Sequence, residues 1–158
     1  MQVDINSVAA AKRLLDGLID KTPLVPSYFL SDVLKNELLL KLENMQPIGA
    51  FKIRGAINAV HNLPKDTKVV TCCSTGNHGR GIAYAAKLRG IKAQIFMSKL
   101  VPNVKIEAIK NLGAGVILCG EDQAAAELAC QKSVAENGYA EVSPFDDPYV
   151  MAGQGTIG

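Results

Sequence analysis

Short apolar runs alternate with longer helical patterns along the second half of the chain. The apolar runs are rich in β-branched residues and predict four strands, at residues 69–73, 93–97, 115–119 and 139–143. The stretches between them predict three helices, each followed at once by a glycine, at residues 78–89, 103–112 and 122–137. Strands that alternate with helices in this way are typical of a parallel sheet with helices on both faces. The pattern therefore predicts an α/β fold.

The first part of the chain is less regular. In chain order, the pattern predicts a helix at residues 7–18, a loop at 21–24, a strand at 37–43 and a helix at 50–63. A loop at residues 62–66, which contains Pro64, is the best candidate for a domain boundary.

The end of the chain, residues 149–158, predicts the opening of a helix for which the sequence shows no partner. Residues 153–158 also match the pattern G-x-G-x-x-G letter for letter. A dinucleotide site needs a strand before this pattern, a helix after it and an acidic residue about 20 positions further on. Because this context is missing, we do not expect these glycines to bind a nucleotide.

Composition and charge narrow the class of protein. Of the 158 residues, 48% are hydrophobic and 20% are charged, a balance typical of a globular domain. The net charge of +2 comes from scattered side chains without a block of like charge, so we expect no nucleic acid partner. The chain begins without the features of a signal peptide and has no apolar run of the roughly 20 residues that cross a bilayer. We therefore expect a soluble, cytoplasmic protein without a membrane partner.

The four cysteines show no C-x-x-C pair and no histidine at ligand spacing, so we expect no metal site. Cys72 and Cys73 are neighbours in a predicted strand and point to opposite faces, which argues against a disulfide between them. We expect both to be reduced thiols that pack as small hydrophobic residues.

A short polar turn follows the first strand of the α/β pattern. Ser74, Thr75, Gly76 and Asn77 lie between the end of that strand and the start of a helix, where unpaired backbone N–H groups and the helix dipole favour an anion. The carboxyl ends of strands are also where ligands collect in open α/β sheets. The alternative is that the Ser, Thr and Asn side chains only cap the helix. Taken alone, His78 is an ordinary residue of the first turn.

A lysine at the start of the helix predicted at residues 50–63 is the second candidate site. The polar residues that recur at helical spacing predict a solvent-facing stripe: Arg54, Asn58, His61 and Lys65. Lys52 lies off this stripe and shares a face with Ala56, Ala59 and Leu63. Its ammonium group either reaches out to solvent along its apolar stem or stays near a partner with a lowered pKa. In the second case, the amine is nucleophilic and can form a Schiff base.

Together these two segments are recognisable. With "GAFKIRGAINAV", "STGNHGRGIAYAAKLRGIKA" and the supporting "AGQGTIG", the chain resembles the fold-type II pyridoxal-phosphate enzymes of the threonine dehydratase and serine racemase group. The resemblance spans nearly the whole chain, with the motifs in the expected order. Within this group, "CCSTGNHGRGIAYAAK" followed by "MSKLVPNVK" is most similar to the hydroxyectoine-utilisation dehydratases. The related sulfhydrylase-like lyases typically have Asp-Arg after the lysine, where this chain has Ile53-Arg54.

The resemblance implies a role for each motif residue. Lys52 would form the Schiff base with pyridoxal 5′-phosphate and later remove the substrate Cα proton, while Phe51 would pack beside the cofactor ring. Asn77 would bind the phenolic oxygen of the cofactor. The residues implied to hold the substrate carboxylate are Ser74, Thr75, Asn77 and His78. The implied reaction is β-elimination from a hydroxy amino acid such as threonine or serine, which gives a keto acid and ammonia.

Two positions depart from the family pattern. Ala50 stands where a serine is common, which removes one hydroxyl near the cofactor. Thr75 stands where racemases carry the serine that acts on the opposite face of the substrate, and its extra methyl group changes reach and rotamer. We therefore expect a dehydratase. A serine racemase-like isomerase and a non-catalytic fragment are the alternatives.

Family members are about twice as long as this chain, so we expect it to be an incomplete, N-terminal part of the enzyme. The resemblance implies a complete small α/β domain at residues 67–146, with residues 1–66 and 147–158 belonging to a truncated large domain. We expect apolar faces of the large-domain pieces to be exposed, and the isolated chain to have little turnover. For the full-length form we expect a homodimer.

Overall fold

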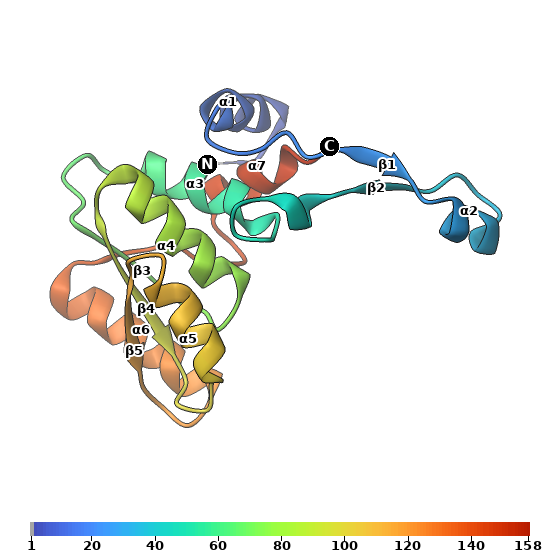
Figure 1. Cartoon of the computed structure of the whole chain (residues 1–158). Coiled ribbons are helices and arrows are strands. Elements are labelled where there is room, and N and C mark those ends of the chain that lie inside the picture. The colour runs from blue at the N-terminus through green and yellow to red at the C-terminus, as the bar shows by residue number, and fades with distance from the viewer. Residues whose placement is uncertain (1) are drawn as a thin grey trace.

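A central sheet of parallel strands organises the computed structural model, which describes residues 2–158 (Figure 1). The strand order is β5-β4-β3-β6, with β5 (Gly115–Leu118), β4 (Lys92–Met97), β3 (Val69–Cys73) and β6 (Ala140–Glu141). The helices between these strands are α4 (Asn77–Arg89), α5 (Asn103–Lys110) and α6 (Gln123–Asn137). The α/β fold predicted from the hydrophobic pattern is confirmed, with strand β6 shorter than predicted.

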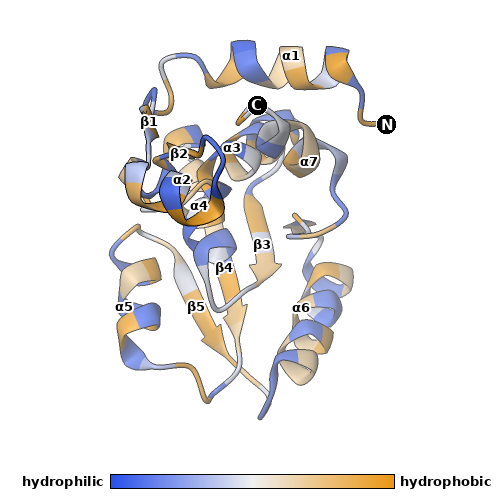
Figure 2. Ribbon diagram, turned by 90° about the vertical axis from the view of Figure 1, so that its right-hand side faces the viewer, coloured by the Kyte–Doolittle hydropathy of each residue, from blue (hydrophilic) through white to orange (hydrophobic). Residues whose placement is uncertain are grey.

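Helices cover both faces of this sheet, as predicted. Figure 2 shows α5 and α6 on opposite sides of the strands. Neighbouring side chains of β3 lie on opposite faces of the sheet. Cys72 belongs to the same buried cluster as Ile82 of α4, and Cys73 belongs to the same cluster as Ala126 of α6. Both thiols are buried and free, and burial raises the pKa of Cys73 to about 12. The expectation that the two cysteines pack as small hydrophobic residues is confirmed.

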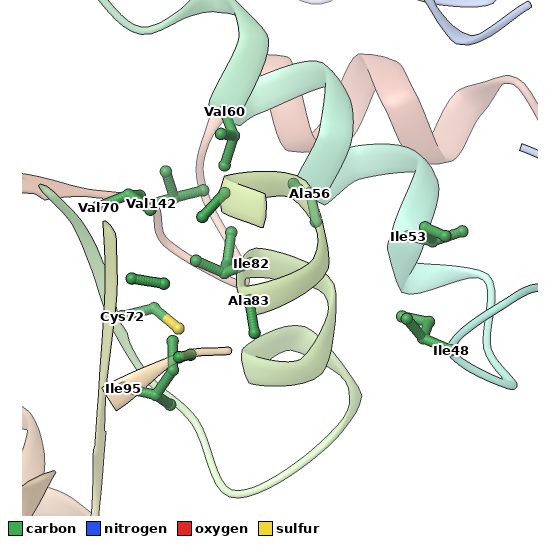
Figure 3. Close-up of a cluster of buried hydrophobic side chains, with 14 of the residues drawn as sticks. Ile48, Ile53, Ala56, Val60, Val70, Cys72, Ile82, Ala83, Ile95 and Val142 are labelled. Carbon is green, nitrogen blue, oxygen red and sulfur yellow. The ribbon is translucent and has the colours of Figure 1, made fainter. Parts of the chain in front are cut away.

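Helix α3 (Lys52–Asn62) connects the sheet layer to the two ends of the chain. On one side, Ala56 and Val60 share a buried cluster with Ile82 and Ala83 of α4 (Figure 3). On its other side, α3 packs against α7 (Pro148–Gly155), and α7 also packs against α1 (Ile5–Leu15). The final helix therefore has partners, contrary to the expectation from the sequence.

Close helix packing explains the glycines near the end of the chain. A Cβ atom added to Gly153 would lie 2.6 Å from the Cα of Gly55, and one added to Gly155 would lie 2.9 Å from a methyl carbon of Val8. Glycine lets α7 approach α3 and α1 closely, so packing accounts for these two glycines without a nucleotide.

The segment before α3 differs from the prediction. The strand predicted at residues 37–43 shortens to β2 (Leu39–Lys41), which pairs with β1 (Leu24–Pro26) in an antiparallel ribbon, and a 3₁₀ turn follows at Glu43–Met45. Between the two strands lies α2 (Tyr28–Leu34), which the sequence analysis missed. None of its residues is buried, and the ribbon and α2 extend away from the rest of the molecule (Figure 1).

Large apolar side chains are exposed on this extension. Tyr28 is 82% exposed and Phe29 77%, and Val33, Leu34 and Leu39 are exposed as well. An exposed apolar patch of this kind marks an interaction surface or a site of association. The exposed apolar faces expected for this part of the chain are therefore present.

The solvent-facing stripe predicted on α3 is wrong at two of its four positions. Arg54 and Asn58 are only 6% and 3% exposed. The Arg54 guanidinium is bound by Glu43, and Asn58 Nδ2 donates to the carbonyl oxygen of Tyr149 at 2.7 Å. These polar side chains face α7 and the 3₁₀ turn, because each finds a buried hydrogen-bond partner there.

No helix within residues 2–158 combines the length and the hydropathy needed to span a bilayer.

Candidate active site

Lys52 lies at the first position of α3 with its side chain partly buried. The residue before it, Phe51, occupies the N-cap position, and the Lys52 Nζ atom lies 5.6 Å from the centre of the Phe51 ring. The same Nζ atom donates a hydrogen bond to the carbonyl oxygen of Pro144 at 3.4 Å. The amine therefore rests between an aromatic ring and a backbone carbonyl from the distant segment that leads into α7.

The turn at residues 74–77 opens α4 without a side-chain cap. Gly76 is the N-cap residue and makes no capping hydrogen bond, because it has no side chain. The Ser74 hydroxyl instead accepts a hydrogen bond from the N–H of Gly76 at 3.3 Å. The first N–H groups of α4 point along the helix axis and have no partner within the helix. The proposal that these side chains only cap α4 is thus not supported, and the turn keeps the donors that an anion needs.

Helices α3 and α4 are in close contact near the start of α3. A Cβ atom added to Gly81, one turn into α4, would lie 2.9 Å from the Cβ of Ala56 and 3.3 Å from the carbonyl oxygen of Lys52. The first turn of α3 therefore touches α4 one turn after the start of that helix. Of the predicted site residues, Phe51 and Lys52 lie on the α3 side of this contact, and the others lie on the α4 side: Ser74, Thr75, Asn77 and His78.

His78 follows the turn as the second residue of α4 and is buried, at 4% exposure. Its Nε2 atom donates to the carbonyl oxygen of Val142 at 2.9 Å, which fixes the tautomer that carries the proton on Nε2. Its Nδ1 atom is buried and has no hydrogen-bond partner. Burial lowers the pKa of His78, and the nearby positive charge of Lys52 adds to this effect, while the hydrogen bond to the Val142 carbonyl and the charge of Asp147 oppose it. We therefore expect a neutral ring at pH 7, held by the carbonyl group of Val142, the residue that follows β6.

The segment between β6 and α7 supplies contacts that the sequence analysis missed. The carbonyl oxygen of Val142 binds His78, and that of Pro144 binds Lys52. At the end of the segment, the Asp147 side chain accepts hydrogen bonds from the N–H groups of Tyr149 and Val150 and so caps α7. One sequence signal was available, because Asp147 precedes a proline at the first position of a helix. For the carbonyl groups of Val142 and Pro144, the sequence offers no comparable signal.

Substituting Gly81 tests the contact between α3 and α4. We expect Gly81→Ala to lower the free energy of unfolding by about 1–3 kcal/mol, because the new methyl group forces the two helices apart. Gly76→Ala is the matched control, since the space around that position is open and its φ angle is −133°. Urea unfolding of both variants measures the difference. Equal stability of the two variants would contradict the close contact.

The residues at this site fit a pyridoxal-phosphate cofactor. A partly buried primary amine suits an aldehyde, a neighbouring aromatic ring suits a planar heterocycle, and a helix start without a side-chain cap suits an anionic group. Among residues 2–158, the structure shows no cluster of three or more side chains that could hold a metal ion.

Comparisons with known proteins point to the same chemistry. Residues 15–158 match the family model described as pyridoxal-phosphate dependent enzyme. A catabolic L-threonine dehydratase of Staphylococcus aureus is 43% identical over 99% of this chain and 46% of its own length. Among solved structures, maize serine racemase superposes with a TM-score of 0.92 at 34% identity, over 99% of this chain and 48% of its own. Threonine deaminase isoform 2 from Solanum lycopersicum superposes with a TM-score of 0.86 at 34% identity, over 98% of this chain and 44% of its own.

The chain thus spans about half the length of the curated relatives that it matches. The family match covers nearly all of it and includes both the lysine and the polar turn. The chain belongs to the family of pyridoxal-phosphate dependent enzymes of fold type II, as the resemblance implied.

Proposed function

We propose that this chain carries the cofactor lysine and the carboxylate-binding turn of a dehydratase that acts on a β-hydroxy amino acid such as serine or threonine. One observation supports the proposal: α4 packs closely against the first turn of α3, which carries Lys52, and α4 begins without a side-chain cap. The catabolic threonine dehydratase reported above is a relative that supports this substrate class.

Lys52 is the residue that would hold the cofactor and move the proton. Pyridoxal phosphate, when bound, supplies an electron sink that stabilises negative charge at the substrate Cα. The Lys52 Nζ atom would take the Cα proton, and the carbonyl oxygen of Pro144 would help to orient the amine. Phe51 would lie against the cofactor ring, and Asn77, whose side chain is exposed at the first position of α4, would reach its phenolic oxygen.

The turn would hold the substrate carboxylate through its backbone N–H groups and the hydroxyl groups of Ser74 and Thr75. His78 would contribute its backbone N–H, since its Nε2 atom is engaged by Val142. Binding the carboxylate here orients the Cα–H bond relative to the lysine.

A spectroscopic and a chemical assay test the proposal. The protein, expressed with any continuation of its reading frame, is mixed with pyridoxal phosphate, and we expect violet absorbance that borohydride abolishes. We then expect ammonia release from L-serine or L-threonine but none from L-alanine, which lacks the β-hydroxyl group. Hydroxyectoine-derived amino acids belong in the same assay as the finer substrate prediction. D-serine formation without ammonia would favour the racemase-like alternative, and cofactor binding without either product would refute the dehydratase.

We further propose the domain division predicted above, with residues 67–146 as the small domain and residues 1–66 and 147–158 as parts of the large domain. The packing of α7 against α1 and α3 supports this assignment. A homodimer of the full-length form and a cytoplasmic location stay predictions.

A further inference from the structure

The imidazole ring of His78 is buried, and the proposed function gives it no role, because the turn uses only the backbone N–H of this residue. One ring nitrogen, Nε2, donates to the carbonyl oxygen of Val142 at 2.9 Å. The other, Nδ1, is buried and has no partner in the described chain. A buried polar atom without a partner destabilises a folded protein, so such an atom calls for an explanation. The contact made by Nε2 is the place to look for it.

Val142 is a fixed point of the chain, because both of its backbone groups are bonded and its side chain is fully buried. Its N–H donates to the carbonyl oxygen of Thr71 in β3 at 3.0 Å, and its carbonyl oxygen accepts from His78. Its side chain belongs to the buried cluster that contains Val70 and Ile82 (Figure 3). The His78 ring therefore fastens the chain at the point where it leaves β6.

Two residues beyond this point lies the carbonyl group that contacts the cofactor lysine. The carbonyl oxygen of Pro144 accepts a hydrogen bond from Lys52 Nζ at 3.4 Å. Between the two points, the Ser143 hydroxyl accepts hydrogen bonds from the N–H groups of residues 145–146, at 3.2 and 3.4 Å. Hydrogen bonds of this kind hold a short turn in shape. A short, turned segment thus joins the carbonyl that binds the His78 ring to the carbonyl that binds the Lys52 amine.

We infer that His78 is a positioning residue, whose ring holds the segment at residues 142–144 so that the Pro144 carbonyl orients the Lys52 amine. The inference rests on the proposed function for the task of that amine, but the arrangement itself can be measured without a substrate. The ring acts through Lys52 and does not bind the substrate carboxylate. Its loss should therefore slow the step in which the amine takes the proton, without weakening substrate binding.

Two substitutions separate the hydrogen bond from the bulk of the ring. His78→Leu fills a similar space but cannot donate, whereas His78→Gln carries an amide N–H group at about the distance of Nε2 from the backbone. Ile82→Val is the matched control, because it shortens a buried side chain one turn further along α4 and leaves the ring in place. If His78→Leu does not fold, His78→Asn replaces it, since its amide is one methylene group shorter than that of glutamine and does not reach Val142.

The first measurement needs neither cofactor nor substrate. In ¹³C-labelled protein, nuclear Overhauser effects report whether the end of the Lys52 side chain lies against Pro144. We expect these contacts in the wild type, in His78→Gln and in Ile82→Val, and their loss in His78→Leu. Unchanged contacts in His78→Leu would overturn the inference, and so would their equal loss in Ile82→Val.

The second measurement is steady-state kinetics with L-serine on the cofactor-loaded protein. We expect His78→Leu to lower kcat by about 10- to 100-fold and to leave KM within a factor of about two, because a misplaced amine slows proton removal. His78→Gln should restore kcat to within about threefold of the wild-type value. A higher KM at unchanged kcat in His78→Leu would show that the ring binds the carboxylate, which contradicts the inference. If the wild type shows no turnover, the proposed function fails, and the first measurement alone decides whether His78 positions Lys52.

Discussion

Replacing Lys52 by alanine is expected to abolish cofactor attachment completely. Wild-type protein treated with pyridoxal phosphate and borohydride should carry the cofactor on the tryptic peptide that contains residue 52, and the Lys52→Ala protein should carry none. We expect this loss because the amine of Lys52, beside Phe51 and Pro144, is the group at this site that can react with an aldehyde. Mass spectrometry of the reduced protein, together with loss of the violet absorbance, measures the effect.

The same experiment has a control in Lys105→Ala, which removes an exposed amine from α5 on the far side of the turn. That variant should keep the label on residue 52. We also expect ammonia release to fall by a factor of at least about 10³ in Lys52→Ala, as when a catalytic group that acts both as nucleophile and as base is removed. A borohydride-stable adduct on another lysine of the site in the Lys52→Ala protein would show that the assignment is wrong.

The strand–turn–helix unit that carries the polar turn was predictable because its signals are local. The run at residues 69–73 is apolar and β-branched, the turn is small and polar, and Gly90 ends the helix in the left-handed conformation. Each of these features depends on neighbours in sequence. The same holds for α6, which begins at an Asp122 cap and ends at Gly138.

Polar residues that are buried by distant partners were not predictable from periodicity. Arg54 and Asn58 recur at helical spacing with His61, and a helical wheel treats all three as solvent-facing. Arg54 is buried against Glu43, a residue of the 3₁₀ turn. Asn58 is buried against the backbone carbonyl of Tyr149, near the end of the chain. Helix α2 was missed for a related reason, since none of its residues is buried and its apolar side chains follow no core-facing stripe.

The sequence predicted the side chains of the candidate site but not the backbone groups that contact them. Lysine and the polar turn were found by residue type and context, but the carbonyl oxygens of Val142 and Pro144 are backbone groups that every residue carries. Only the fold shows that the segment between β6 and α7 passes both His78 and Lys52. The orientation of the lysine therefore depends on tertiary structure more than on the helix that bears it.

The buried ion pair between Arg54 and Glu43 is the other feature whose loss should have a large effect. Arg54 Nε lies 2.8 Å from Glu43 Oε2, and its second nitrogen donates to Oε1 at the same distance. Thr22 also donates to this carboxylate, and Arg54 reaches Thr156 at the end of α7. The network ties the first turn of α3, which carries Lys52, to three other parts of the chain.

We expect Glu43→Gln to lower the free energy of unfolding by about 3–5 kcal/mol, because it leaves the Arg54 guanidinium buried without its counter-charge. The control is Asp32→Asn, which breaks the pair between Asp32 and Lys35, both about 80% exposed, and should cost less than about 1 kcal/mol. If Glu43→Gln does not fold, the double variant Glu43→Leu with Arg54→Met tests the same point. It should recover folding, because a pair of apolar residues removes both charges. Urea unfolding is the measurement, and equal losses for Glu43→Gln and Asp32→Asn would contradict the role of the buried pair.

The same pair predicts a specific loss of stability in acid. Burial by itself would raise the pKa of Glu43, but hydrogen bonds from Arg54 and Thr22 and the charge of Arg54 lower it from 4.5 to about 2. Since the folded pKa lies below the unfolded one, the stabilisation is fully present above pH 4.5 and disappears as the pH falls through about 2. The difference corresponds to about 3 kcal/mol. Urea unfolding between pH 6 and pH 2 should therefore show a decline that is flatter in Glu43→Gln, because glutamine does not titrate, and parallel curves for the two proteins would show that this carboxylate is not the group responsible.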